Sequence, residues 1–445
     1  MIGGPVFHKI RGILSGTDRL LILKIFSMVS ILTASIITLF FYRRGGVVDA
    51  VYGAESSQGF RDTGIYARAA EKLLSGLSPY LDSSLSFRSG PFGVLLFALI
   101  PMSPIAFICY QIFNIIGILV FCKVFLRDSF PQESYFICLA LTIYFSCVRE
   151  IFSTGQITGI LAGLIAFGYE GVKSQRISAR LGGAFLFALA LDLKPNLFVF
   201  FVLGSFIFLD RKREFWLPCF FLLCGHLIID LHAGRLLERD WISTLMAVSD
   251  PERDPSNTGT RTIWPLVKSW LQLEFIPSAI PTLVFILLGC TLLYALLKTN
   301  NQYIFFLTLI VPAFYNYYHL YSFFPFAAII FAIMISRSMP ITLGVVLPLL
   351  LVSGAHFGFG QLLYCSFLLG VVLFLLAFTN PMFQNVIFAR HFLTSSTVVI
   401  LARFVFQLKL GSSWIQEIYN LNFLVLFGIG LLLWVSFTEE SSGAR

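Results

Sequence analysis

Long runs of apolar residues recur along almost the whole chain, and they constrain its fold more than any other feature. The first, LILKIFSMVSILTASIITLFFY at residues 21–42, can cross the hydrocarbon layer of a bilayer, which needs about 20 helical residues. A transmembrane barrel would alternate apolar and polar residues, and no such alternation is sustained here. The sequence therefore predicts an all-α polytopic membrane protein.

The composition agrees with this class. The chain is 57% hydrophobic and 12% charged, with a mean hydropathy of +0.85, whereas soluble domains carry roughly 25% charged residues. The formal net charge is +8, but no basic tract resembles a nucleic-acid arm, so no nucleic-acid partner is expected. The cysteines lack metal or redox spacing and no glycine-rich phosphate loop follows a strand, so we expect no metal, disulfide framework or cofactor.

Charged segments orient the chain in the membrane, because short basic loops stay in the cytoplasm. The basic residues before the first span predict an uncleaved anchor with a cytoplasmic amino terminus. The run PFGVLLFALIPM at residues 91–102 is too short to span, so we interpret it as a re-entrant or juxtamembrane helix. This non-spanning interpretation places two later short loops in the cytoplasm. Their basic residues are Lys173, Arg176, Arg180, Arg211, Lys212 and Arg213.

The remaining apolar runs bring the total to roughly 12–14 transmembrane helices. They lie near residues 105–126, 134–149, 155–170, 181–193, 197–209, 215–233, 279–297, 302–316, 318–336, 339–355, 361–379, 393–409 and 420–437. Residues 234–262 are expected to form a polar outer loop. The last spans carry few polar residues, so we interpret them as scaffold.

A polar helix is predicted in the first outer loop, within RDTGIYARAAEKLLSGLSPY at residues 61–80. Asp62 is placed to cap this helix and Gly76 to end it. Its apolar residues form one stripe and Arg68, Glu71 and Lys72 lie opposite, as is typical of a helix on the membrane surface. Taken alone, a capping role worth about 1 kcal/mol explains Asp62 at least as well as a catalytic one.

Several further polar residues are predicted to reach the same outer face: Arg149, Gln156, Lys194, Arg261 and His319. Each also has a structural explanation. Lys194 could extend to lipid headgroups, Arg149 could anchor the interface, and Gln156 suits a helix amino terminus. His319 could carry a proton, bind phosphate or belong to an aromatic belt.

Other ionisable residues are alternative candidates for a functional site. Asp49, Asp82 and Asp192 are further carboxylates, of which Asp192 is expected to neutralise Lys194. One apolar span carries His226, Asp230 and His232. A metal site or proton path is conceivable there, although His226 and Asp230, spaced i, i+4, are expected to satisfy each other.

The order of several segments resembles glycosyltransferase family 87, which contains polyprenol-phosphate-mannose-dependent α-1,2-mannosyltransferases. The segments are the Asp62 helix through Tyr66 and Tyr80, then SGPFGVLLFALIPMSP, STGQITGILAGLIAFG, GGAFLFALALDLKPN and NYYHLYSFFPF. The chain departs from the family where Gly90 and Pro91 replace a usual Pro-Pro pair, and where Tyr318 and His319 replace paired histidines.

The resemblance implies a C-type glycosyltransferase fold with a catalytic membrane module at 1–340, C-terminal scaffold helices at 341–445, and juxtamembrane helices in the first outer loop. It implies transfer of a hexose, mannose by default, from a polyprenyl-phosphate donor to a glycan or glycolipid acceptor. The protein would lie in the plasma or inner membrane, among lipids, with its site facing the periplasm or exterior.

By the same resemblance, Asp62 matches the catalytic aspartate and would be the base of an inverting displacement. Lys194 and His319 would bind substrate, with Arg149, Gln156, Arg261, Tyr66 and Tyr80 as further candidates. A transporter or flippase, with acids at mid-membrane, remains an alternative. So does a polysaccharide polymerase or ligase, which would use the arginines of the loop at 234–262.

Overall fold

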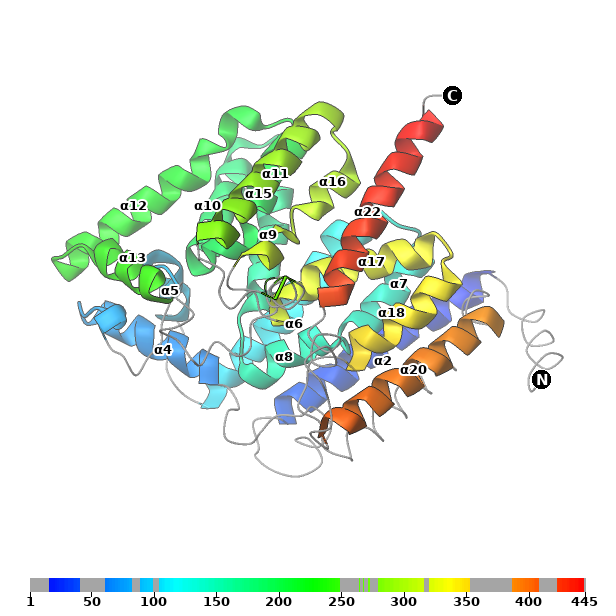
Figure 1. Cartoon of the computed structure of the whole chain (residues 1–445). Helices are drawn as coiled ribbons and strands as arrows, with labels where there is room; N and C mark the ends of the chain where they lie inside the picture. The colour runs from blue at the N-terminus through cyan, green and yellow to red at the C-terminus, as the bar shows by residue number, and fades with distance from the viewer. Residues whose placement is uncertain are drawn as a thin grey trace.

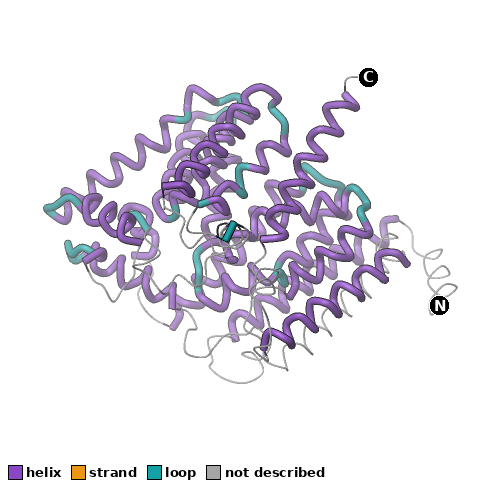
Figure 2. The backbone as a smooth tube through the Cα atoms, viewed as in Figure 1, coloured by secondary structure: helices purple, strands orange, loops and turns teal. Residues whose placement is uncertain are grey.

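The computed structural model describes residues 16–40, 61–81, 89–98, 104–248, 264, 267, 271–272, 279–315, 320–352, 386–407 and 422–443. Within these ranges the chain forms seventeen α-helices, a few 3-10 turns and no strand (Figure 2). The predicted all-α class is confirmed for this part of the chain.

The helices form two groups on either side of α6 (Pro104–Leu126), with α8 (Ser146–Thr154) between them (Figure 1). To the left of α6 and above it in the view lie α4 (Arg61–Leu74), α5 (Pro91–Ala98), α9 (Thr158–Lys173), α10 (Ile177–Leu193), α11 (Pro195–Phe208), α12 (Trp216–Ala233), α13 (Leu237–Val248), α15 (Ala279–Thr299) and α16 (Gln302–Leu307). On the right lie α2 (Gly16–Phe40), α7 (Gln132–Thr142), α17 (Phe324–Ser336), α18 (Pro340–Val352) and α20 (Val386–Gln407). The last helix, α22 (Asn422–Gly443), packs on α16 and α17.

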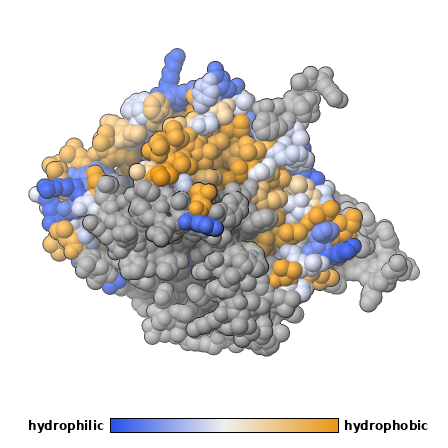
Figure 3. Space-filling view, in the orientation of Figure 1, coloured by the Kyte–Doolittle hydropathy of each residue, from blue (hydrophilic) through white to orange (hydrophobic). Residues whose placement is uncertain are grey.

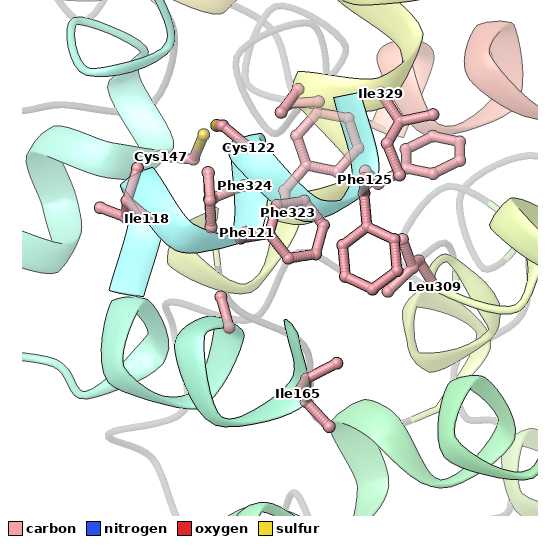
Figure 4. Packing of buried hydrophobic residues seen from close by; sticks show 14 of the residues in the cluster. Ile118, Phe121, Cys122, Phe125, Cys147, Ile165, Leu309, Phe323, Phe324 and Ile329 are labelled. Atoms are coloured by element: carbon pink, nitrogen blue, oxygen red, sulfur yellow. The ribbon is translucent and has the colours of Figure 1, made fainter. Parts of the chain in front are cut away.

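Aromatic side chains of α6 join the two groups (Figure 4). The Phe121 ring packs on Phe324 of α17 at a centroid distance of 5.4 Å. One turn later, Phe125 packs on Phe201 of α11 at 5.4 Å and on Tyr169 of α9 at 5.0 Å. Helix α6 is therefore the centre of the apolar core.

Glycines bring α6, α9 and α10 into close contact. A Cβ added to Gly163 of α9 would lie 2.7 Å from the Cα of Gly117 on α6, and one at Gly159 would lie 2.6 Å from a carbonyl oxygen of α6. Likewise, a Cβ at Gly171 of α9 would lie 2.7 Å from the Cα of Gly183 on α10. Small residues spaced four apart are the usual device for close helix packing in membranes, where lipid offers the same apolar contacts as a neighbouring helix.

Three helical segments are long and apolar enough, by length and composition, to cross a membrane: Ile108–Leu126, Lys212–Ala233 and Ala279–Thr299. The second exposes large apolar side chains, with Leu223 72% and Leu231 75% exposed. Figure 3 shows apolar residues over much of the surface in view. These features indicate a membrane protein, as the sequence predicted.

Two predicted spans are not continuous helices. The run at 134–149 is divided between α7 and α8, because the chain turns at residues 143–145 and the Tyr144 hydroxyl donates to the Ser30 carbonyl oxygen of α2 at 3.2 Å. The run at 302–316 is the six-residue α16 followed by the 3-10 turn η4 (Val311–Phe314). Pro312 has no N–H to continue an α-helical ladder there. Residues 361–379, another predicted span, lie outside the described ranges.

The polar helix predicted within residues 61–80 is confirmed as α4. It ends where predicted: Gly76 has φ +69°, its N–H donates to Leu73 O at 3.0 Å, and the N–H of Leu77 donates to Lys72 O at 2.8 Å. This pair of bonds is the Schellman arrangement. The helix begins at Arg61, so Asp62 lies within its first turn rather than before it as a cap.

The short apolar run after α4 forms α5, which has eight residues and is about 12 Å long at a rise of about 1.5 Å per residue. This is well short of the roughly 30 Å hydrocarbon thickness, as expected for a helix that does not span. Helix α5 packs on α4, α10 and α12. It therefore joins the predicted catalytic loop to the helical bundle.

Candidate functional site

The α9–α10 hairpin has two chemically different ends. At its connecting turn, which we call the basic end, Arg180 contacts Glu214 at 2.5 Å, and Arg211 Nη2 donates to Gln175 Oε1 at 3.0 Å. These bonds join the turn to the loop before α12. The two basic loops predicted to share one side of the membrane therefore lie together.

The opposite end of the hairpin, which we call the polar end, contains two of the predicted site residues in contact. Helix α9 has 16 residues and is about 24 Å long, which separates this end from the basic end. Lys194 follows α10 and precedes Pro195, the first residue of α11. Its Nζ donates to Gln156 Oε1 at 2.9 Å.

Gln156 is held between α8 and α9 by contacts on both sides. Gly155 ends α8 with φ +70°, and the Gln156 N–H donates to Ile151 O at 3.0 Å. From α6, the amide of Asn114 donates to Gln156 O at 2.8 Å and accepts the Ile160 N–H at 3.1 Å. Asn114 thus serves as the cap that α9 lacks locally. It was missed as a site residue because its role depends on the contact between α6 and α9.

Asp192, two residues before Lys194, joins three elements at the polar end. Its carboxylate accepts the Gly93 N–H at 2.7 Å, and its main-chain oxygen accepts the Gly90 N–H at 2.7 Å. A Cβ at Gly90 would overlap the carboxylate, so only glycine fits beside it. The second carboxylate oxygen lies 2.5 Å from His226 Nε2 on α12.

The expected ion pair between Asp192 and Lys194 is therefore wrong. Residues two apart on a helix point in different directions, so the two side chains take partners on different neighbouring elements. Asp192 contacts His226, and Lys194 contacts Gln156.

The expected pairing of His226 with Asp230 is also wrong. His226 bridges two carboxylates, with Nε2 on Asp192 and Nδ1 2.9 Å from Glu238 Oε1 on α13. Asp230 Oδ1 instead accepts the N–H of Leu237, the first residue of α13, at 2.8 Å. Glu238 was missed because it lies in the predicted polar loop at 234–262, which contains the helix α13.

Asp230 of α12 also interacts with the Glu238 carboxyl. Burial, followed by the interaction with Asp230, raises the pKa of the Glu238 carboxyl. Tyr80 lies nearby on the 3-10 turn η1 (Pro79–Leu81), and its hydroxyl donates to Ser89 O at 2.8 Å. Burial, and then the carboxylates of Asp192, Glu238 and Asp240, raise the pKa of Tyr80 well above its ordinary value. Tyr80 is therefore a neutral hydrogen-bond donor at this end.

The other predicted site residues are not brought to this cluster by the described contacts. The Tyr66 ring is buried and stacks on Phe97 of α5 at 5.1 Å, which is a packing position. Asp62 and Arg149 lie on α4 and α8, and their side chains belong to the part that is not described. Arg261 and His319 lie outside the described residues altogether.

Among the described residues, no three His, Cys, Asp or Glu side chains are grouped so that they could hold a metal ion. The polar end contains the Lys194 ammonium, which donates to the Gln156 amide oxygen. It also contains the His226 imidazole, which lies between the carboxylates of Asp192 and Glu238. Such a set can bind an anion and move protons. No protein-family model matches the chain, and neither does any curated protein or solved structure.

Proposed function

We propose that the chain is an integral-membrane glycosyltransferase that uses a polyprenyl-phosphate sugar. It transfers a hexose, most simply mannose, to a glycan or lipid-linked acceptor on the non-cytoplasmic face of the plasma or inner membrane. This activity and a C-type glycosyltransferase fold are what the sequence resemblance to glycosyltransferase family 87 implies.

The observation that carries the proposal is the contact between Lys194 and Gln156 at the polar end. The two residues come from separate family-like segments, 38 positions apart. An ammonium held at the end of apolar helices suits the phosphate of a lipid whose prenyl chain lies in the bilayer. Gln156 limits the positions that the lysine side chain can take.

The sidedness of this pair agrees with an external site. The cations of the basic end would remain in the cytoplasm under the positive-inside rule, and the length of α9 then puts Lys194 toward the other face. Helix α4, which carries Asp62, belongs to the same end as Lys194, because His232 Nε2 near the end of α12 lies 3.2 Å from Leu74 O. The predicted base and phosphate-binding lysine thus come from elements that meet at one end.

In the proposed reaction, the acceptor hydroxyl attacks the anomeric carbon of the donor. Asp62 takes the hydroxyl proton as the new carbon–oxygen bond forms. The bond to the prenyl phosphate breaks with its electron pair on oxygen, and Lys194 stabilises the charge that develops there. A single displacement of this kind inverts the anomeric configuration.

The test is incubation of purified protein with a panel of polyprenyl-phosphate hexoses and candidate acceptors, followed by mass spectrometry of the products. The wild type should form a glycosylated acceptor and free prenyl phosphate. Asp62→Asn should abolish the product while the protein keeps its melting temperature in detergent. A fully active Asp62→Asn protein would remove the proposed base, and an inactive wild type with every donor would remove the function.

A lipid-linked-sugar flippase is the second candidate, favoured by the buried Asp192 and the partly buried His226 on apolar helices. Ionisable residues among transmembrane helices often mark the path of a transported group. Reconstituted vesicles separate the two functions: a flippase would move labelled donor between leaflets without acceptor and without releasing sugar.

A further inference from the structure

Asp192, His226 and Glu238 form a hydrogen-bonded series of graded exposure, which we call the histidine chain. The side chain of Asp192 is 0% exposed, that of His226 14% and that of Glu238 27%. Asp192 is fixed by the Gly93 N–H and His226 by both carboxylates, and the ring of Trp241 packs edge-on against the imidazole at 5.7 Å. The series therefore leads from the buried start of α5 to a carboxyl that solvent or substrate can reach.

The histidine chain must hold more than one proton. Each imidazole nitrogen faces a carboxylate oxygen, yet a neutral imidazole has only one N–H. An additional proton on the ring or on a carboxyl is therefore required for both contacts to be hydrogen bonds.

The groups that face Glu238 indicate where the additional proton of the histidine chain resides. Asp230 and His226 face it from α12, and Asp240 lies on its own helix. Tyr80 faces it from η1, and Asp192 lies behind His226. The carboxylates outnumber the imidazole, and burial and Asp230 raise the pKa of Glu238. With the Nε2–H of His226 directed at the fully buried Asp192, Nδ1 is left as an acceptor, which favours the additional proton on Glu238.

We propose that Glu238 donates a proton to the phosphate that leaves in the transfer reaction, and that His226 and Asp192 are positioning residues for it. This proposal rests on the proposed function. It gives the site an acid at Glu238 in addition to the base at Asp62. Glu238 lies at the same end as Lys194, because the histidine chain begins at Asp192, two residues before the lysine.

The step is balanced as follows. The donor is a phosphate diester, and breaking its bond to the sugar leaves a monoester whose second pKa is about 6. As this bond breaks, Glu238 gives its proton to a non-bridging phosphate oxygen, while Asp62 receives the proton of the acceptor hydroxyl. Afterwards Asp62 releases its proton to water and Glu238 takes one up, which restores both groups.

The deciding variants are Glu238→Gln and its matched control, Asp240→Asn on the same helix. Glutamine keeps the shape of Glu238 and can still accept from His226, but it cannot give up a proton. Glu238→Gln should lower kcat with the prenyl-phosphate donor about 100- to 10,000-fold. The kcat of Asp240→Asn should stay within about twofold of the wild-type value, because the Asp240 carboxylate affects the site only by longer-range electrostatics.

The pH profile separates proton donation from a merely structural role. An acid works while it holds its proton, so wild-type kcat should fall as pH rises through the pKa of Glu238. Glu238→Gln should lack that alkaline fall, and His226→Gln should move it to a different pH. Protonation of Glu238 should also appear as an infrared carbonyl band that is lost in Glu238→Gln.

Wild-type levels of kcat and an unchanged alkaline fall in a folded Glu238→Gln protein would overturn this inference and leave the proposed function intact. Absence of sugar transfer by the wild type with every donor would overturn both. Melting temperatures of all variants in detergent show whether the low rates reflect chemistry or unfolding.

Discussion

The two ends of the α9–α10 hairpin both carry many charges but hold them in opposite ways. At the basic end, the Lys173–Glu170 pair has side chains that are 50% and 44% exposed. At the polar end, Asp192 is completely buried and each of its carboxylate oxygens has its own partner. Exposed pairs contribute about 0–1 kcal/mol, whereas breaking a buried pair costs about 3–5 kcal/mol. This contrast is what the proposed function requires, with the basic end orienting the chain and the polar end carrying the site.

The largest effect expected from this contrast is an all-or-none difference in chemical labelling, which tests on which side of the membrane each end of the hairpin lies. With native cysteines removed, a cysteine at Arg235, in the turn between α12 and α13, should react with an impermeant maleimide in intact cells. A cysteine at Gln175 of the basic end should react only after the membrane is opened. The reverse labelling pattern would place the polar end in the cytoplasm and refute the external site.

The next largest effect concerns stability. Asp192→Ala leaves His226 and the Gly93 N–H without their partner in the interior, so it should lower the free energy of unfolding by about 3–5 kcal/mol. Asp192→Asn keeps an acceptor for Gly93 and should cost less. Glu170→Ala, which breaks the exposed pair at the basic end, should cost about 1 kcal/mol or less. Melting in detergent measures all three, and equal losses at the two ends would contradict the distinction.

Substrate handling should distinguish two lysines. Lys194→Ala removes a charged donor, worth about 1.5–3 kcal/mol, which corresponds to a rise of about 10- to 150-fold in the KM for the prenyl-phosphate donor. Lys173→Ala, at the exposed basic end, should leave the KM unchanged. Steady-state kinetics at varied donor concentration give both values, and an unchanged KM in Lys194→Ala would count against phosphate binding.

A smaller and more selective effect is expected at Asn114. Asn114→Leu removes both of its hydrogen bonds and should destabilise the protein by about 1–3 kcal/mol. The same variant should raise the KM for the donor, because Gln156 loses the bond that holds its main chain to α6.

The matched control for Asn114 is Gln111→Leu, on the same buried face of α6. Gln111 donates to Phe152 O at 3.1 Å and not to Gln156. Its loss should lower stability without the same change in donor KM. If Asn114→Leu lowers stability but leaves the donor KM unchanged, Asn114 only caps α9 and does not position Gln156.

Local features of the fold were accessible from sequence because their causes are local. Apolar runs predicted the all-α class, and Gly76 predicted the end of α4 through its left-handed backbone. The breaks in the runs at 134–149 and 302–316 were less accessible. The first depends on a hydrogen bond from Tyr144 to α2, which no local pattern reveals. Pro312 and the capping Asn301 could have signalled the second.

For the candidate site, the sequence supplied Lys194 and Gln156 but not the neighbours that hold them. The repeated spacing of Gly159 and Gly163 could have predicted a close helix contact, and with it a partner on α6 for the start of α9. Nothing local indicated that Asp192 would meet His226, 34 residues later, or that His226 would continue to Glu238.

The amino-acid sequence by itself determined that this protein is a bundle of apolar helices, with its basic turns grouped and a polar helix after the first span. These properties follow from hydrophobicity, charge and backbone preference, each of which acts over a few residues. Only the tertiary structure decided which buried polar groups pair. An apolar interior requires every such group to find a partner, but the partner's identity depends on which helices touch.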